Sequence, residues 1–217
     1  KFIPDDMKEE MKNLAGLQAG DTIFFIADNE KLASLYAGQI RTELGERLDL
    51  IDKNAYRFCY INDFPMYEYD KEEKKYIFTH NPFSMPQGGL AALTEKDPED
   101  ILAYQYDIVC NGIELSSGAV RNHNLDIMIK AFEIAGYTEE DLKNKFGALY
   151  HAFQFGAPPH AGMAPGVDRM IMLLRNEENI REIIPFPMNG NAQDLMCGAP
   201  NEVSEMQLRE VHIKVRD

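Results

Sequence analysis

The sequence predicts an α+β protein in two parts, a small α/β unit over residues 1–52 and a larger part over residues 53–217 with antiparallel strands and flanking helices. Three observations support this prediction. Residues 1–52 combine helical apolar spacing with one continuous apolar run. Short apolar runs between turn residues fill positions 53–120, and they include an Asn111-Gly112 pair that is typical of a tight hairpin. Helical spacing of apolar residues returns after residue 124.

The first part is expected to pack rather than to carry chemistry. Asp5 begins a predicted helix that ends at Gly16, and residues 22–27 form a predicted buried strand. Asn29 is an N-cap candidate for a second amphipathic helix. We find no cluster of reactive side chains in these residues.

The second part is expected to begin with strands and to continue with helices. The predicted elements are, in order, a strand at 58–61 broken at 62–65, a hairpin of 66–69 with 76–79, a loop over 85–100, a hairpin around Asn111-Gly112, a helix from Leu125 to near Gly136, a helix after a capping box at Thr138, and a short strand from Gly162 that leads into a helix at Val167.

The Asn111-Gly112 turn fixes a register in which Val109 faces Glu114 and Asp107 faces Ser116. Directly opposed residues share a face and faces alternate along a strand, so Asp107 and Glu114 fall on one face, roughly 7–8 Å apart at Cα. Two carboxylates at this separation can hold one hard cation. The alternative, for an isolated hairpin, is two solvated acids on the wet face of a sheet.

Arg121 lies seven residues after Glu114, and this odd separation would place the two on opposite faces of a regular strand. Residues 116–118 are Ser-Ser-Gly, which suit a β-bulge. A bulge there would turn Arg121 onto the face of Glu114.

A glycine-bearing segment, residues 162–169, runs into a helix whose first turn contains Asp168 and Arg169. An arginine at an already electropositive helix N-terminus suits the binding of a polyanion. The alternative is a surface arginine on an ordinary amphipathic helix.

Composition narrows the functional classes. The net charge of −14 argues against a nucleic-acid-binding surface on this segment. The three cysteines are scattered without a metal or disulfide pattern, which suits a reducing cytoplasm, and the five histidines form no zinc pattern. No apolar run is long enough for a membrane span. The chain starts with neither a signal peptide nor methionine, so we expect it to be part of a longer protein.

Seven segments, in order and spacing, resemble bacterial-type aspartyl-tRNA synthetases of class II. They are Asp63–Glu68, His80–Phe83, Tyr106–Glu114, Gly118–Arg121, Gly156–His160, Gly166–Arg169 and Ile184–Pro187. The resemblance implies that residues 1–52 are the C-terminal part of the bacterial-type (GAD-like) insertion domain. Residues 53–217 would then be the C-terminal half of the class II catalytic domain, including its motif 3. The chain resembles roughly the last third of the enzyme, without motifs 1 and 2.

The resemblance also implies roles for individual residues. Arg169 would hold the γ-phosphate of ATP, and Arg121 and His80 would contact aspartate. Glu114 and Asp107 would bind ATP through Mg²⁺. Gly166, Val167 and Asp168 would line the nucleotide. The sequence departs from the family's usual pattern at Asn81, Ser116, Ser117 and Pro165.

The activity implied is that of a cytoplasmic aspartate–tRNA ligase, which forms aspartyl-adenylate from L-aspartate and ATP and transfers aspartate to the 3′ end of tRNA. Its full-length form would be a homodimer with no membrane attachment, and the isolated 217-residue chain is expected to be inactive. Two alternatives stay open. One is a class II paralogue without a tRNA role, and the other is a folded module without catalysis.

Overall fold

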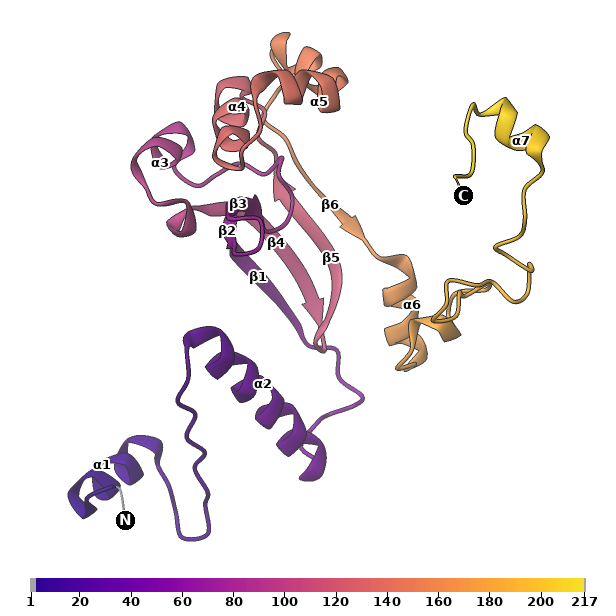
Figure 1. The fold of residues 1–217 in the computed structure, drawn as a ribbon. Helices are drawn as coiled ribbons and strands as arrows, with labels where there is room; N and C mark the ends of the chain where they lie inside the picture. Colours follow the sequence, from indigo (N-terminus) through magenta and orange to yellow (C-terminus); the bar gives the residue numbers. More distant parts are fainter. Residues whose placement is uncertain (1–2, 217) are drawn as a thin grey trace. The chain divides into compact units, whose positions relative to one another are not determined.

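The computed structural model describes residues 3–216. It divides into two compact units, Lys1–Ala55 and Tyr56–Asp217. The predicted boundary followed residue 52. Figure 1 labels the elements of both units, which are described separately below.

The N-terminal unit contains two helices, α1 (Asp5–Ala15) and α2 (Glu30–Arg47). The predicted C-terminus of α1 is confirmed, because Gly16 ends this helix in the left-handed conformation (φ 64°). The predicted N-cap of α2 is also confirmed, because the Asn29 side chain accepts a hydrogen bond from the Leu32 N–H at 3.0 Å. The predicted strand at 22–27 is wrong. These residues form no ladder with another strand, and within residues 3–55 the structure assigns none with which they could pair. The described part of this unit is therefore helical rather than α/β.

The C-terminal unit is built on a four-stranded sheet in the order β1-β4-β5-β6, and its neighbouring strands are antiparallel. The strands are β1 (Phe58–Pro65), β4 (Leu102–Cys110), β5 (Ile113–Val120) and β6 (Ala161–Pro165), and a separate hairpin joins β2 (Tyr67–Asp70) to β3 (Lys75–Phe78). This mixture of helices and antiparallel sheet confirms the predicted fold class. The predicted break at 62–65 is wrong, because β1 continues to Pro65 through a register shift at Asp63 (φ 60°), opposite which β4 has one additional residue.

The remaining helices follow the strands. They are α3 (Gly89–Glu95), α4 (Leu125–Ile134), α5 (Glu139–Gln154), α6 (Val167–Arg175) and α7 (Glu205–Glu210), with 3₁₀ turns at Pro98–Asp100 and Ile180–Glu182. The sequence analysis treated 85–100 as a loop and missed α3. This seven-residue helix follows Gly88 and buries only Ala92 and Leu93, too few residues to show a helical period. In the described part of the chain, no helix has the length and apolar character of a membrane span.

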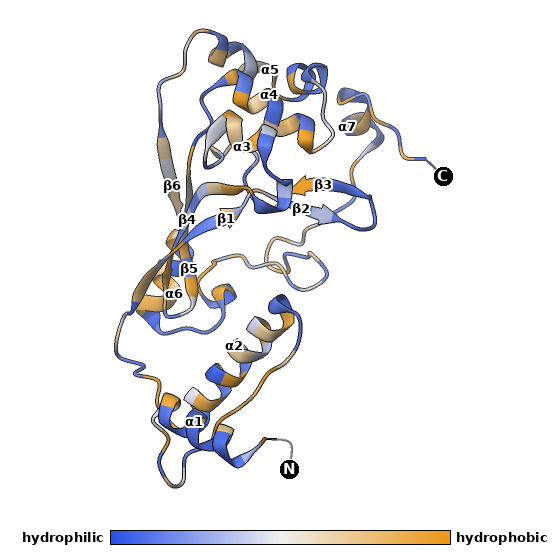
Figure 2. Cartoon of the chain, turned by 90° about the vertical axis from the view of Figure 1, so that its left-hand side faces the viewer, coloured by the Kyte–Doolittle hydropathy of each residue, from blue (hydrophilic) through white to orange (hydrophobic). Residues whose placement is uncertain are grey.

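One of the two hydrophobic clusters of this unit centres on Phe132 of α4. Its ring lies 5.0 to 5.7 Å from four other aromatic rings, measured between centroids, and these belong to Phe78, Phe83, Tyr137 and Phe146. Figure 2 shows the end of β3, which supplies Phe78, as hydrophobic, whereas the loop that joins β2 to β3 is hydrophilic. The core thus connects the small hairpin to α4 and α5.

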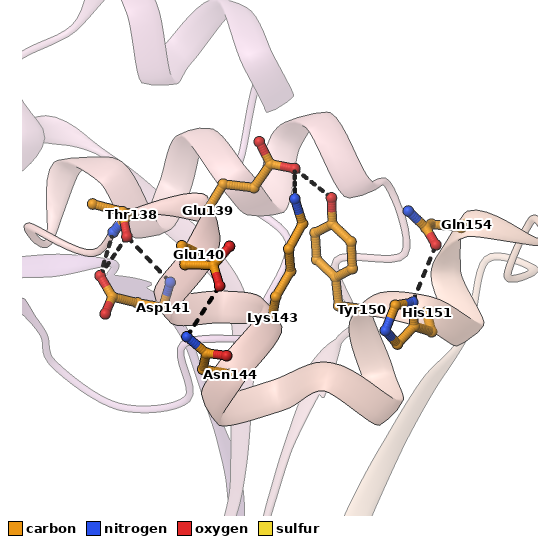
Figure 3. Close-up of polar contacts among 9 residues, drawn as sticks. All are labelled: Thr138, Glu139, Glu140, Asp141, Lys143, Asn144, Tyr150, His151 and Gln154. Atoms are coloured by element: carbon orange, nitrogen blue, oxygen red, sulfur yellow. Dashed lines mark hydrogen bonds and ion pairs between the residues drawn. The ribbon is translucent and has the colours of Figure 1, made fainter.

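Helix α5 is kinked at Phe146, whose backbone is not helical (φ −128°, ψ 30°). The Tyr150 hydroxyl donates to the Glu139 carboxylate, which also pairs with Lys143 at 2.9 Å (Figure 3). A straight helix would separate Glu139 and Tyr150 by about 16 Å along its axis, so this hydrogen bond depends on the kink. The predicted capping box at the start of α5 is confirmed, because Thr138 and Asp141 bond each other's backbone N–H.

The Tyr150–Glu139 contact predicts how stability responds to acid. Hydrogen bonds from Tyr150 and Lys143 lower the pKa of the Glu139 carboxyl. A carboxyl whose folded pKa is depressed contributes stability above its unfolded pKa, about 4.3, and loses that contribution as pH falls through the folded pKa. Glu139→Gln should therefore lose less stability than the wild type between pH 6 and pH 3, measured as urea midpoints. Glu140→Gln, on the same turn, should follow the wild type. Parallel curves for wild type and Glu139→Gln would contradict the expectation.

Candidate functional site

The site begins with the turn between β4 and β5. Asn111 (φ 51°) and Gly112 (φ 82°) both have positive φ, and the predicted pair Val109–Glu114 is present. Beyond it the predicted register is wrong, because Ile108 pairs with Ser116 and Asp107 with Ser117. Leu115 is the additional residue of a β-bulge.

The bulge places three charged residues on one face of the sheet. Glu114 shares the face of Val109, and Asp107 lies two residues from Val109 on the same strand. Arg121 is four residues beyond Ser117, the partner of Asp107, so it returns to that face. The common face of Asp107, Glu114 and Arg121 is thus confirmed by the register. The irregularity that produces it lies at Leu115, one residue before the predicted segment.

The turn between β6 and α6 forms a hydrogen bond to the bulge. The Gly166 N–H donates to the Leu115 carbonyl at 2.7 Å. Arg169, in the first turn of α6 as predicted, donates from Nη1 to the Glu114 carbonyl at 2.8 Å and lies 3.2 Å from the Glu114 carboxylate. The two side chains are 44 % and 46 % exposed, so water weakens this ion pair and an incoming anion can compete for the guanidinium.

A cavity of about 330 Å³ is lined by residues of β5, of β6 and of the loop that follows β3. Its lining residues are Asn81, Ser117, Gly118, Ala119, Arg121, His160, Ala161, Gly162, Met163 and Ala164. The guanidinium carbon of Arg121 lies 5.5 Å from the centre of the Phe83 ring, which ties this side chain to the aromatic core. Its Nε is buried and has no hydrogen-bond partner within residues 3–216. A buried donor without a partner costs about 1–3 kcal/mol, and a bound anion would remove that cost.

His80 and Asn81 differ in their relation to this cavity. His80 is exposed, packs edge-on against Phe64 with ring centroids 4.8 Å apart, and is not among the lining residues. Asn81, its neighbour, lines the cavity, while its side-chain oxygen accepts the Phe83 N–H at 2.9 Å. Two other lining residues, Ser117 and His160, were given no role by the sequence analysis. The parity of Ser117 with Arg121 was the signal that could have found the first.

Asp107 and Glu114 are the candidate cation ligands. In the described part of the chain, no group of three or more His, Cys, Asp or Glu side chains converges on a possible metal position. Two carboxylates on one face suit Mg²⁺, which is commonly held by one or two carboxylates together with water and substrate phosphates. The residues present therefore fit a magnesium ion that arrives with a phosphate ligand.

Gly118 allows β6 to lie close to the site. The Tyr106 hydroxyl donates to the Gly162 carbonyl at 2.9 Å, and its ring lies over Gly118. A Cβ added at Gly118 would meet both the Tyr106 ring and the Gly162 carbonyl oxygen at 2.4 Å. The floor of the cavity therefore requires a residue without a side chain at this position.

The antiparallel sheet thus brings the hairpin of β4 and β5, with its two acids, next to Arg169 at the start of α6. Residues 4–190 match the family model for "tRNA synthetases class II (D, K and N)". The chain belongs to this family.

The curated relatives carry a narrower name than the family model does. The chain is 57 % identical over 215 residues to the aspartate–tRNA(Asp/Asn) ligase of Wolbachia pipientis subsp. Culex pipiens, and 58 % identical over 213 residues to that of Zymomonas mobilis. These alignments cover 99 % and 98 % of this chain but 36 % of each relative. The chain therefore spans about a third of the length of the curated relatives it matches.

Among solved structures, the aspartyl-tRNA synthetase of Entamoeba histolytica matches 86 % of this chain and 32 % of its own, with 23 % identity and a TM-score of 0.47. The asparaginyl-tRNA synthetase of the same organism matches 88 % of this chain and 36 % of its own, with 18 % identity and a TM-score of 0.46.

The close packing at Gly118 gives a matched pair of variants. Gly118→Ala should lower the free energy of unfolding by about 1–3 kcal/mol, the usual cost of overpacking, because the added methyl meets a strand carbonyl and a fixed ring. Gly162→Ala is the control, since a Cβ there meets nothing within 4 Å. Urea denaturation of the 217-residue chain and both variants measures the difference. Equal stability of the two variants would show that the contact at Gly118 is not limiting.

Proposed function

We propose that this chain is the part of an aspartate–tRNA ligase that binds the side chain of L-aspartate and the outer phosphates of ATP. Class membership and the identity to curated aspartate–tRNA(Asp/Asn) ligases support the reaction class. The observation that carries the assignment to this chain is Arg121, with its buried, unpartnered Nε in a cavity next to the shared face of Asp107 and Glu114.

In this proposal Arg121 binds the side-chain carboxylate of aspartate. A guanidinium presents parallel N–H donors that match the two oxygens of a carboxylate. Phe83 holds the guanidinium from one side, so the ligand meets a donor set that is already oriented. The lining is otherwise made of small or neutral residues apart from His160, which suits a short amino acid.

The first reaction step needs no protein nucleophile. The α-carboxylate oxygen of aspartate bonds to the α-phosphorus of ATP, the bond from that phosphorus to the bridging oxygen breaks, and pyrophosphate leaves. In the second step a ribose hydroxyl at the 3′ end of tRNA attacks the activated carbonyl carbon and AMP leaves. Catalysis of this kind depends on positioning and on compensation of developing charge.

Arg169 and the two acids serve the phosphate end. We assign Arg169 to the γ-phosphate and to the departing pyrophosphate, and Gly166, Val167 and Asp168 to the walls of the nucleotide site. Asp107 and Glu114 would hold Mg²⁺, which neutralises phosphate charge when it is bound. His80 remains a proposed contact of the amino acid, although in this structure it packs on Phe64.

The proposal extends to the longer protein. The intact ligase would take ATP, L-aspartate and tRNA as substrates, act as a homodimer and work in the cytoplasm. The N-terminal unit would be the C-terminal part of the GAD-like insertion domain, and the remainder would be the C-terminal half of the catalytic domain.

The aspartate contact is tested by Arg121→Leu in a ligase of the relatives' full length that contains this chain. Loss of one buried, oriented donor group should lower aspartate-dependent ATP–pyrophosphate exchange by about 10²–10³-fold. Arg175→Leu, an exposed arginine at the end of α6, is the control and should keep the activity. Unchanged KM and kcat for aspartate in Arg121→Leu would reassign Arg121 to a structural role.

A second measurement concerns the 217-residue chain by itself. It supplies Arg121, Arg169 and the acids on one side of the reacting phosphate, and a missing charge-stabilising donor on the other side costs about 10²–10³-fold in rate. Exchange activity of the purified chain should therefore fall at least that far below the full-length ligase, while its circular dichroism shows a folded product. Activity within tenfold of the full-length ligase would contradict this division of the site.

A further inference from the structure

Tyr106 links two strands that are not neighbours in the sheet. It belongs to β4, pairs with Gly118 of β5, and donates its hydroxyl hydrogen to the carbonyl of Gly162 in β6, with 2.9 Å between the two oxygens. Strands two places apart in a sheet are separated by about 9–10 Å, so a side chain that joins them must cross the strand between. The Tyr106 ring crosses at Gly118, where an added Cβ would lie 2.4 Å from a ring carbon. The sequence analysis gave Tyr106 no role.

Side-chain packing does little to hold β6 in place. Within residues 3–216 this strand pairs with β5 alone, at the end of the sheet, and all five of its residues are exposed. Gly162 adds conformational freedom, because a residue without a Cβ can rotate its peptide groups over a wider range than any other. The Tyr106 hydroxyl therefore restrains β6 at its most permissive residue.

Backbone hydrogen bonds hold the two ends of β6 against β5. Before the strand, the Arg121 N–H donates to the His160 carbonyl at 2.9 Å, and after it the Gly166 N–H donates to the Leu115 carbonyl at 2.7 Å. The hydroxyl of Tyr106 reaches β6 between these two points and from a third strand. It thus adds a side-chain contact that sets how β6 lies across β5.

The alignment of β5 with β6 matters because each strand leads to one of the two proposed substrate contacts. Arg121, directly after β5, is the proposed partner of aspartate, and Arg169, in the first turn of α6 after β6, is the proposed partner of the γ-phosphate. The reaction joins a carboxylate oxygen of one substrate to the α-phosphorus of the other, so neither arginine holds a reacting atom. The distance between the reacting atoms therefore depends on how the two strands are aligned.

We propose that Tyr106 is a positioning residue for the ligase reaction, which fixes β6 against β5 through the Gly162 carbonyl and so sets the distance between bound aspartate and the α-phosphorus of ATP. The inference rests on the proposed function. Tyr106 is not among the residues that line the cavity, so its hydroxyl should affect the rate of the chemical step rather than the affinity for either substrate. A displacement of about 1 Å at the reacting atoms can cost about 10²-fold in rate.

The test compares a ligase of the relatives' full length that contains this chain with its Tyr106→Phe variant, which keeps the ring and removes only the hydroxyl. Tyr104→Phe is the matched control, because Tyr104 lies two residues earlier on the same face of β4 and is 47 % exposed. Rapid mixing with aspartate, ATP and Mg²⁺ gives the single-turnover rate constant and the amplitude of adenylate formation. Tyr106→Phe should lower the rate constant by about 10-fold to 10²-fold, while KM for aspartate and for ATP in steady-state exchange stays close to that of the unmodified ligase. Tyr104→Phe should match the unmodified ligase in both measurements.

The amplitude separates positioning from stability. A variant that is only less well folded has fewer active sites, which lowers the amplitude of adenylate formation and leaves the rate constant of the remaining sites unchanged. An unchanged rate constant in Tyr106→Phe, with or without a loss of amplitude or a rise in KM, would overturn the inference. Absence of aspartate-dependent adenylate formation in the unmodified ligase would instead reject the proposed function.

Discussion

The bulge at Leu115 is the constraint on which the arrangement of the site depends. Side chains alternate along a strand with a period of two, so the separation of seven positions from Glu114 to Arg121 would direct the two side chains to opposite faces. The one extra residue corrects this parity. It also turns the Leu115 carbonyl toward Gly166, and the neighbouring Glu114 carbonyl accepts from Arg169. One backbone irregularity therefore determines two things. It places the two acids on the same face as Arg121, and it provides the carbonyl groups to which the start of α6 bonds.

Local sequence signals predicted much of this arrangement. The Asn111-Gly112 turn, the Asn29 cap and the Thr138 capping box depend on nearest neighbours, and the structure contains all of them. The position of the bulge depends on a distant strand. Ser116 pairs with Pro165, which has no N–H to donate, and Gly166 bonds to Leu115 instead. No signal within residues 113–121 could have shown this.

Other differences have the same origin in tertiary structure. Residues 22–27 have the composition of a strand, but a strand needs a partner, and residues 3–55 offer none. The resemblance implied a ligand contact for His80 and marked Asn81 as a departure from the family's pattern, yet packing decides which of the two side chains reaches the cavity. Phe64 takes the His80 ring, and the turn at Phe83 brings Asn81 to the cavity. The sequence analysis named His80 as the contact, whereas its neighbour Asn81 is the residue that lines the cavity.

The aromatic cluster around Phe132 also contacts two residues of the cavity, Arg121 and His160. Phe132 contacts Phe83, whose ring lies beneath the Arg121 guanidinium. The second part of α5 packs Phe153 against the core around Phe132 and Leu142 and presents the same ring to His160. Arg121 and His160 thus both contact aromatic rings of one hydrophobic cluster, and a change in that cluster would reach both of them.

The outer edge of β1 has a consequence for how such a protein could be assembled. Within residues 3–216 this strand pairs with β4 on one side, and Phe58 and Tyr60 are 65 % and 70 % exposed. The backbone N–H and C=O groups of the other side can accept a further strand, and the aromatic side chains would give that addition a preferred register. In engineering terms, the edge of β1 is a place where a separately produced strand could be added to this sheet without a peptide bond.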